Sequence, residues 1–594
     1  MTGHAGGVVG SLGLALLFVA PSRVQRLVGL GAWALGAILL AVYLAPHGHR
    51  PLLGGLAVVG LVLAAAGAFV IRRWPFVLPF AVLACIAARI HVHVGSTEAN
   101  LLVPMYAVVA AAALLLAWEL LQGDSRAREL GPAAWPLAAF VAWFGLSILW
   151  TQDLRQGSID LLFFYLPFGL LAIVLARLAW NRLIAIGLLV ELTAMALVFS
   201  AIGIYQYETR DVFWNPKLLV SNAFAPFYRV NSVFWDPSIY GRFLVVAILA
   251  LLVAVLFTRD LRVMLGATAA IAAIWAGLYF SYSQSSFAAL AGGVVLAAVF
   301  AWGRRGLILA IVAGVIVLAA AFAVPSVRHD VFGHNTKSTT SGRGTLVRRG
   351  AHIAVHHPVA GVGIGGFKHA YAELAGLRGK EPAAAASHTT PMTVAAEGGI
   401  VGFALYVWLL VAALGLALRR FARDLPGLAS LTFGLVIAAV AVHSLFYNAF
   451  FEDPTIWAAI GLAAALPRRP EEATESPALD RQVEPERQED QRVDGAQQQG
   501  AAERDVEALP EHRQPDGRAH REHDPPPLVG HREDLLRADR HPEEHHQVRD
   551  QRRDRRADHP VRRDQDDVEP DVDERRSARD HPVELRLLGP ADPD

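Results

Sequence analysis

Up to about Pro467 the chain alternates long apolar runs with short polar segments. The runs are rich in Ala, Leu, Val and Gly and are roughly 20 residues long, the length a helix needs to cross about 30 Å of hydrocarbon. Because a helix satisfies its own backbone hydrogen bonds in lipid, the pattern predicts an all-α polytopic membrane protein, a bundle of about 12–15 transmembrane helices. The candidate spans lie near residues 8–21, 27–45, 51–71, 75–94, 101–121, 131–150, 158–177, 183–204, 239–257, 263–281, 285–302, 306–324, 396–418, 428–449 and 455–467.

The short loops between these spans alternate in charge. Every second loop, such as "PSRVQR", "DSRARE", "TRDLR" or "RRFARD", carries several arginines, whereas the intervening loops, such as "STEAN" and "FEDPT", carry one or none. Cytoplasmic loops are enriched in basic residues. The alternation therefore places the arginine-rich loops in the cytoplasm, and it predicts that two long loops, near residues 205–238 and 325–395, share the extracytoplasmic face.

The composition changes beyond residue 467. Residues 468–594 are dominated by Arg, Asp, Glu, His, Gln and Pro, and they contain no run that can bury a core. We therefore predict a transmembrane helical domain over residues 1–467 and a charged, disordered cytoplasmic tail over 468–594. Acids and bases alternate along this tail, which argues against a nucleic-acid partner because a nucleic-acid-binding arm is predominantly basic.

The polar chemistry concentrates in the two long loops. The first contains Arg229 in the aromatic stretch "FYRVNSVFWDPSIYGR", which is either an interfacial belt or a substrate contact. The second, "SGRGTLVRRGAHIAVHHPVAGVGIGGF", carries Arg343, Arg348 and Arg349 in and around a predicted helix over about 345–356. Arginines on an outer face oppose the usual charge bias, and their forked donors match phosphate. "GVGIGG" has no surrounding βαβ unit, so its glycines predict a turn, or a backbone that approaches a ligand closely, instead of a dinucleotide site.

The stretch "SHTTPMTVAAEGGIVG", residues 387–402, joins the second loop to the next span. Its His388 is either a catalytic group or an interfacial histidine without chemistry. Its Glu397 either orients a cationic partner or is an anion favoured near a helix start. The single cysteine, Cys85, excludes a disulfide within one chain.

Four stretches, taken in order, resemble the O-antigen ligase and O-antigen polymerase superfamily of bacterial envelope membrane proteins. They are "RVNSVFWDPSIYGRF", "SYSQSSFAALAGG", the second-loop sequence quoted above and "SHTTPMTVAAEGGIVG". Two positions depart from the family pattern. Gln284 stands where many members have an arginine, and Thr389 replaces an asparagine. Arg348 or Arg349 is a candidate to supply the phosphate contact that Gln284 lacks.

The resemblance implies transfer of a glycan from an undecaprenyl-pyrophosphate-linked donor to a hydroxyl of a glycan, lipid or protein acceptor. The reaction is expected at the outer face of the bacterial cytoplasmic membrane, with membrane lipid around the protein and without a metal or other cofactor. Arg343 is then expected to stabilise the leaving pyrophosphate, and His388 to act as the general base. The residues expected to bind substrate are Arg229, Gln284, Arg348, Arg349 and Glu397.

Two other classes of function stay open at this point. A polytopic transporter or flippase of envelope glycolipids would be favoured by charges inside the spans, which here are few, chiefly Glu119, Asp160 and Glu191. A non-catalytic scaffold is disfavoured by the ordered set of arginines and histidine. Ligase, polymerase and protein O-glycosyltransferase share one family and differ in acceptor, so the sequence does not choose among them.

Overall fold

A computed structural model describes residues 1–46, 48, 50–94, 97–213, 215–224, 227–323, 343–376, 387–448 and 450–467. The predicted tail, residues 468–594, lies outside the described residues, as do the stretches 324–342 and 377–386 of the second long loop.

The described part of the chain contains 11 helices long and apolar enough to cross a membrane, which confirms the prediction of a polytopic helical protein. In one of them, α7 (Leu154–Asp160) continues through a π-helical turn (Leu161–Tyr165) into α8 (Leu166–Ala176). The others are α1 (Thr2–Val19), α2 (Arg23–Leu44), α3 (Arg50–Arg73), α5 (Val103–Leu121), α9 (Arg182–Thr209), α11 (Pro237–Phe257), α12 (Leu261–Ser281), α13 (Gln284–Trp302), α19 (Thr390–Leu418) and α20 (Leu425–Ser444).

Two predicted spans, at 75–94 and 131–150, are shorter in the structure than predicted, and the last span, predicted to be short, is short. The span predicted at 75–94 is wrong in its second half, because α4 (Val77–Ile86) ends early and the chain enters an antiparallel hairpin of β1 (Ile90–Val94) and β2 (Thr97–Leu101). In β1, "IHVHV", apolar β-branched residues alternate with histidine, the period of a strand. The spans predicted at 131–150 and 455–467 are also short, and they form α6 (Ala134–Ser147) and α21 (Pro454–Ala465).

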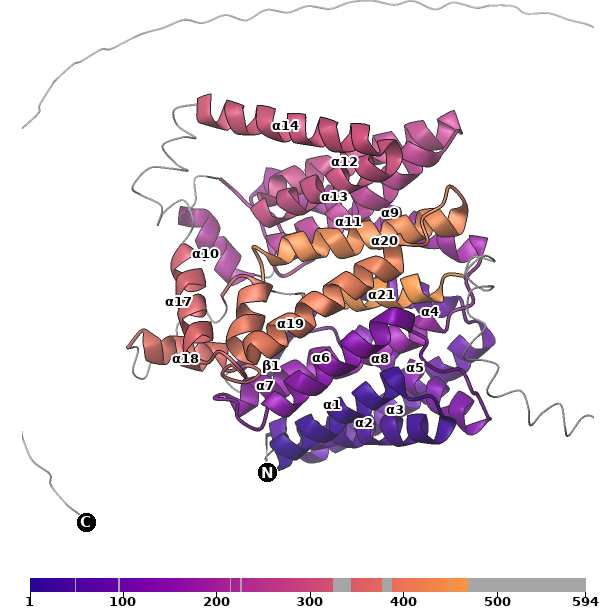
Figure 1. Ribbon diagram of the computed structural model, residues 1–594, viewed down its shortest axis with the longest axis vertical. Coiled ribbons are helices and arrows are strands. Elements are labelled where there is room, and N and C mark those ends of the chain that lie inside the picture. The colour runs from indigo at the N-terminus through magenta and orange to yellow at the C-terminus, as the bar shows by residue number, and fades with distance from the viewer. Residues whose placement is uncertain are drawn as a thin grey trace, which may run out of the picture. The chain divides into compact units, whose positions relative to one another are not determined.

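Successive long helices run back and forth, so their connections alternate between two ends of the bundle (Figure 1). One end, here called the loop end, carries β1, α10 (Pro216–Phe224), α17 (Arg343–His356) and α18 (Phe367–Leu374). The opposite end, here called the arginine end, carries the arginine-rich connections, such as those between α8 and α9 and between α19 and α20. The two long loops therefore share one end, as the alternation of charge predicted.

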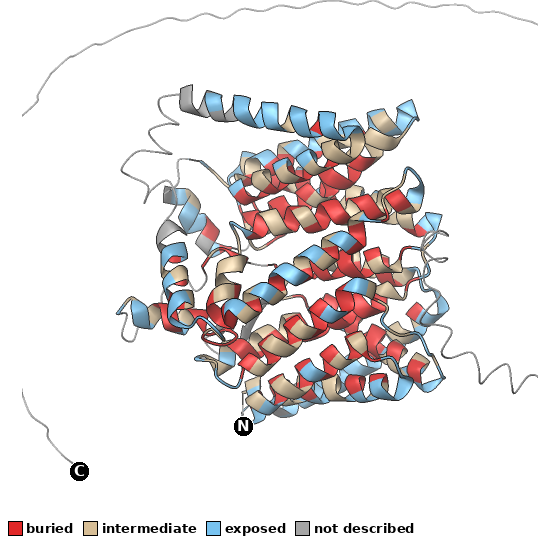
Figure 2. Cartoon of the chain, in the orientation of Figure 1, coloured by how far each residue is buried: buried red, intermediate tan, exposed pale blue. Residues whose placement is uncertain are grey.

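The interior consists of two large hydrophobic clusters and one small one. The first is built mainly from α1, α5, α6, α8 and α21, and the second from α9, α11, α12, α13 and α20. The small cluster joins α17 and α18 to Ala396 of α19 at the loop end. Figure 2 shows buried residues running through the central helices, whereas α14 (Arg304–Ala323) is largely exposed. The exposed residues of α14, such as Ile308 and Leu309, are apolar, as expected for a lipid-facing helix.

A buried ion network ties helices together at the arginine end. Arg177 donates to Glu129 at 2.6 Å and to Glu119 at 2.7 Å, and it also pairs with Asp124. Arg26 of α2 pairs with the same Glu129 at 2.5 Å. Glu119, one of the acids noted inside a predicted span, thus has a structural partner, which weakens the case that it marks a transport pathway.

Candidate active site

The glycines of "GVGIGG" shape the segment between α17 and α18. Gly361, Gly363 and Gly365 have positive φ angles of 67°, 84° and 74°. A Cβ at Gly361 would lie 2.3 Å from the backbone carbon of Glu397, and one at Gly363 would lie 2.5 Å from Cα of Thr151. Glycine is required here both by the backbone conformation and by the close approach of two other segments. The predicted turn is confirmed, and the close approach is to other segments of the chain.

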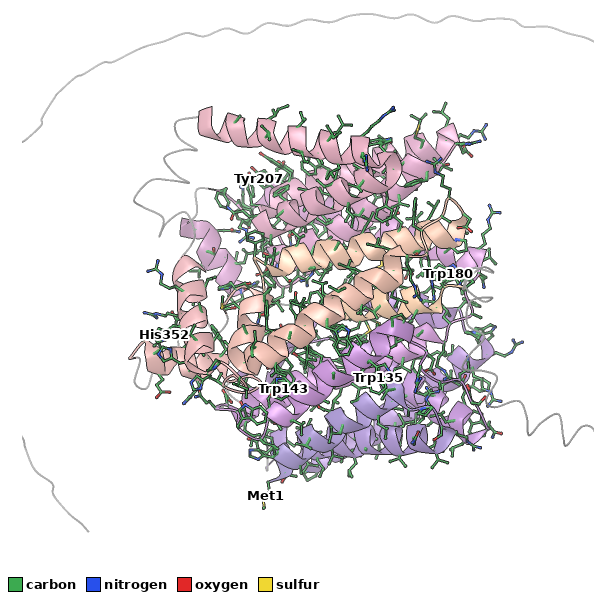
Figure 3. The ribbon with its side chains drawn as sticks, in the orientation of Figure 1. Met1, Trp135, Trp143, Trp180, Tyr207 and His352 are labelled. Carbon is green, nitrogen blue, oxygen red and sulfur yellow. The ribbon has the colours of Figure 1, made fainter. Side chains whose placement is uncertain are left out.

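This segment docks onto the end of α6. The backbone N–H of Ile364 donates to Ser147 Oγ at 3.0 Å, and Thr151 Oγ1 donates to the Ile364 carbonyl at 2.6 Å. On the same side of α6, the indole N–H of Trp143 donates to the carbonyl of Gly398 in α19 at 3.0 Å, and Figure 3 shows Trp143 toward the loop end. The end of α6 thus fixes both the glycine segment and α19.

Helix α19 is broken where the glycine segment meets it. Gly399 has φ 64° and ψ −162°, which is not helical. The Ile400 N–H donates to the Pro358 carbonyl at 2.8 Å, and the Val362 N–H donates to the Ala396 carbonyl at 3.0 Å. The glycine segment therefore supplies backbone partners where the helix is interrupted, which a break at membrane depth needs.

Glu397 lies just before this break and is 8% exposed. Its Oε1 accepts a hydrogen bond of 3.2 Å from the backbone N–H of Phe367, the first residue of α18. The sequence left open whether Glu397 is an anion at a helix start. In the structure its carboxyl group accepts a hydrogen bond at the start of α18 and not of its own helix, α19. Its role in substrate binding stays a prediction.

Around Glu397 the described residues enclose a cavity of about 220 Å³ at the loop end, here called the polar pocket. Carboxyl groups from three separate segments line it together with Lys368 and several aromatic rings. The Gln156 side chain donates to Asp160 at 2.9 Å, and burial raises the pKa of Glu452 to about 7. The full lining is Phe144, Gln156, Asp160, Phe164, Tyr165, Ile364, Gly365, Phe367, Lys368, Thr390, Thr393, Val394, Glu397, Asn448, Phe450, Phe451 and Glu452.

His388 lies beside this pocket, two residues before Thr390, which is one of the residues lining it. It is partly buried and has a left-handed φ of 57°, an unusual conformation for a residue with a side chain. Ser387 helps to hold it, because its hydroxyl donates to the Thr389 carbonyl at 2.6 Å and accepts from the Thr389 N–H at 3.2 Å. Strained backbone of this kind concentrates at functional sites.

The arginines of the second loop differ in their surroundings. Arg343 is the first residue of α17, and its side chain lies outside what the structure describes. Arg348 is exposed. Arg349 donates to the hydroxyl of Tyr371 at 2.8 Å and lies 5.0 Å from the centre of that ring, so it connects α17 to α18. Of these three, Arg349 is the one with a visible structural role.

Arg229 and Gln284 come together at a different turn. The Arg229 Nε donates to the carbonyl of Ser281, the last residue of α12, at 3.2 Å. Gln284 is exposed and begins α13 three residues later. Asn222 fixes the backbone of Arg229 through both its N–H and its carbonyl, at 3.1 and 2.9 Å. The structure thus gathers the predicted residues into two groups at the loop end, one at this turn and one around α17, α18 and the start of α19.

Sequence reasoning missed several charged residues near these groups. Arg242 of α11 forms a buried ion pair with Asp453, and Glu452 and Lys368 line the polar pocket. A signal was present in "EDPT", which repeats the Asp-Pro of "WDPS" at the start of another helix. Asp453 accepts a hydrogen bond from its own helix at 2.7 Å, as Asp236 does at 2.6 Å. Asp before Pro marks a helix start, but it says nothing about the partner across space.

Residues 268–407 match the family described as O-antigen ligase. This confirms, for that segment, the resemblance drawn from the sequence stretches. The match covers less than half of the chain, from within α12 to beyond the break in α19, and leaves Arg229 outside. No curated protein matches the chain. The predicted site residues within the matched segment are Gln284, Arg343, Arg348, Arg349, His388 and Glu397.

Proposed function

We propose that this protein transfers a glycan from an undecaprenyl-pyrophosphate-linked donor to an acceptor hydroxyl. The observation that carries the proposal is the folding of family-matched segments, α17 to α19, into one hydrogen-bonded unit beside a polar pocket at the end of a membrane bundle. The pocket combines carboxyl groups, amides and aromatic rings. Carboxylates accept hydrogen bonds from sugar hydroxyls, and ring faces pack against the apolar faces of a sugar.

The chemistry assigns one role to each group. The acceptor oxygen attacks the anomeric carbon of the donor sugar, and the bond from that carbon to the pyrophosphate oxygen breaks. His388 takes the proton of the acceptor hydroxyl, because histidine as a type exchanges protons near neutral pH. Arg343, assisted by Arg348 and Arg229, stabilises the negative charge that develops on the leaving pyrophosphate. In this scheme arginines do the work that a metal ion does in other phosphate chemistry.

The proposed location follows from the loop charges. Arginine-rich connections gather at one end of the bundle. This distribution supports a cytoplasmic position for that end, and with it a polar pocket on the outer face of the bacterial cytoplasmic membrane. A lipid-linked donor reaches such a pocket without leaving the bilayer. The acceptor, whether glycan, lipid or protein, approaches from the aqueous side.

The test is the gel profile of envelope glycans in a deletion strain complemented with the full chain or its variants at matched protein level. His388→Ala and Arg343→Ala are compared with His352→Ala, an exposed histidine of α17, and with Arg423→Ala, an exposed arginine at the arginine end. We expect the wild type and both controls to restore the profile and the two site variants to fail.

The kind of failure identifies the reaction. Loss of long chains means a polymerase, whereas long chains retained on the lipid carrier mean a ligase. Full restoration by both His388→Ala and Arg343→Ala would overturn the site assignment and favour transport of envelope glycolipids.

A further inference from the structure

A second cavity lies where the two large hydrophobic clusters meet. It has a volume of about 240 Å³ and is formed by α4, α9, α11, α20 and α21; we call it the apolar groove. Its walls are mostly aliphatic and aromatic, with Leu189, Phe243 and Val246 among them. None of these residues was singled out from the sequence.

The groove starts near the arginine end and runs along α11 from Ala254 to Ile239, whereas its lining on α9 and α20 stops at Leu192 and Val436. Trp180 and Leu425, beside the connections at the arginine end, line one part of it. Arg89, Arg242 and Asp453, next to the hairpin or to helix starts at the loop end, line another. Figure 3 shows Trp180 and His352 at opposite ends of the bundle. The groove is therefore an apolar channel with charge at its loop end.

The charged end carries more positive than negative groups. The side chain of Arg242 is 4% exposed and pairs with Asp453, which is 6% exposed. Arg89 adds a second guanidinium, and its buried Nε has no hydrogen-bond partner among the described residues. Two arginines face Asp453 within the lining of the groove, in surroundings where charge interactions are stronger than in water. Glu452 lies beside them and interacts with both arginines, but burial raises its pKa to about 7 and so favours its neutral form. Such a site favours an anion.

The groove and the polar pocket adjoin each other. Glu452 lines the polar pocket, and the next residue, Asp453, lines the groove. Phe451, just before them, also lines the polar pocket, and Pro454, the first residue of α21, also lines the groove. A molecule with an apolar tail in the groove and an anionic group at Arg242 would therefore present its remaining substituent to the polar pocket.

We propose that the groove holds the polyprenyl chain of the donor, with the lipid-side phosphate of its pyrophosphate on Arg242 and Arg89 and the sugar-side phosphate left to the loop arginines, and that Asp453 takes the place of the lipid-side phosphate on Arg242 while the groove is empty. The identity of the lipid rests on the proposed function, whereas the binding itself needs no transfer reaction. The forked donors of arginine match a phosphate as well as they match a carboxylate. Lipid binding then exchanges an internal anion for an external one.

The exchange predicts effects of opposite sign for the two members of one ion pair. Asp453→Asn keeps the cap on α21, because asparagine caps helices as well as aspartate does, and it removes the competing charge. We expect it to tighten binding of undecaprenyl phosphate about tenfold. Arg242→Gln removes the phosphate partner and is expected to weaken binding at least about tenfold.

Binding is measured on the purified full chain in detergent with radiolabelled undecaprenyl phosphate. Undecaprenol tests the tail without charge, and inorganic pyrophosphate tests a headgroup without tail. The matched control is Arg420→Gln, a buried arginine bonded to the carbonyls of Ala463 and Leu466 at the arginine end. Ala254→Trp narrows the groove at its wall. It should weaken the binding of undecaprenyl phosphate and leave the binding of the shorter farnesyl phosphate unchanged.

The proposal is supported if Asp453→Asn tightens binding of undecaprenyl phosphate, Arg242→Gln weakens it and Arg420→Gln leaves it unchanged. Undecaprenol and pyrophosphate should both bind weakly. Equal weakening by both pair variants, or pyrophosphate binding as tightly as the lipid, overturns the proposal. If the pair variants do not fold, the chain-length effect of Ala254→Trp decides alone. A chain that transfers no glycan yet shows this pattern contradicts the proposed function but not the groove. A chain that transfers glycan without this dependence contradicts the groove alone.

Discussion

Replacing Gly363 by alanine tests whether the glycine segment is held by contact with α6. Gly363 has φ 84°, and an added Cβ would lie 2.5 Å from Cα of Thr151 and 2.8 Å from the Ser147 carbonyl. These are backbone atoms, which a side-chain rotation cannot move aside. The substitution therefore has to distort either the glycine segment or the end of α6.

The expected magnitude has two parts. A left-handed backbone costs a residue with a side chain about 1–2 kcal/mol, and overpacking a buried site costs about 1–3 kcal/mol. The sum is a loss of about 2–5 kcal/mol in the free energy of unfolding. Gly376 provides the matched control, because its φ is 66° and no atom of the described residues lies within 4 Å of its added Cβ. Gly376→Ala should lose only the backbone part, about 1–2 kcal/mol.

The assay is equilibrium unfolding of both variants in the same detergent, followed by the glycan profile of each in the deletion strain. We expect Gly363→Ala to be the less stable of the two and to lose the profile, since Ile364 next to it is bonded to Ser147 and Thr151. Equal losses of stability in both variants would refute the reasoning, because backbone strain alone would then explain the glycine.

Two further predictions concern charge. Arg177→Ala removes one cation from three carboxylates, which keep Arg26 on Glu129 and Arg126 on Glu119 and Asp124. Because the lost hydrogen bonds are buried and charged, it should cost about 1.5–3 kcal/mol in unfolding free energy, whereas Arg126→Ala, whose side chain is 53% exposed, should cost less than about 1 kcal/mol. Thermal unfolding in detergent checks this, and similar shifts for the two variants would contradict the assigned burial. Glu452 has a pKa raised by burial from 4.5 to about 7, so the folded state favours its neutral form and stability falls as pH rises through this window. Glu452→Gln should therefore gain stability relative to wild type as the pH rises from 4.5 to about 7, the two pKa values of this group. A constant difference across the titration would argue against a buried acid.

The sequence predicted those features that depend on a single helix or a single loop. Apolar length predicted nearly all the long helices, and alternating arginines predicted that the two long loops share an end. It failed at 75–94 because average hydropathy counts the valines of "IHVHV" without their spacing, and spacing is what separates a strand from a helix. The helix predicted over about 345–356 is confirmed as α17.

The site was predictable in part. The order of motifs along one stretch identified the glycine segment and the residues from Arg343 to Glu397, because these are neighbours in sequence. It did not reveal that Glu397 serves the start of α18, nor that Arg242 meets Asp453, because both depend on how distant segments pack. A residue's local pattern shows which helix it begins and does not show which charge it will meet.

The break at Gly399 has a consequence for how this region is inherited and made. Ile400 bonds to Pro358, and Val362 to Ala396, so two segments of one chain complete a single structural element. A deletion or insertion that displaces either segment would leave polar backbone groups of the other unmatched, so changes of length in one segment must be compensated in the other. Synthesis proceeds from Pro358 toward Ile400, so the earlier segment is already made when the later one leaves the translocation machinery. The segment from Pro358 to Val362 is therefore already present when the break in α19 at Gly399 forms.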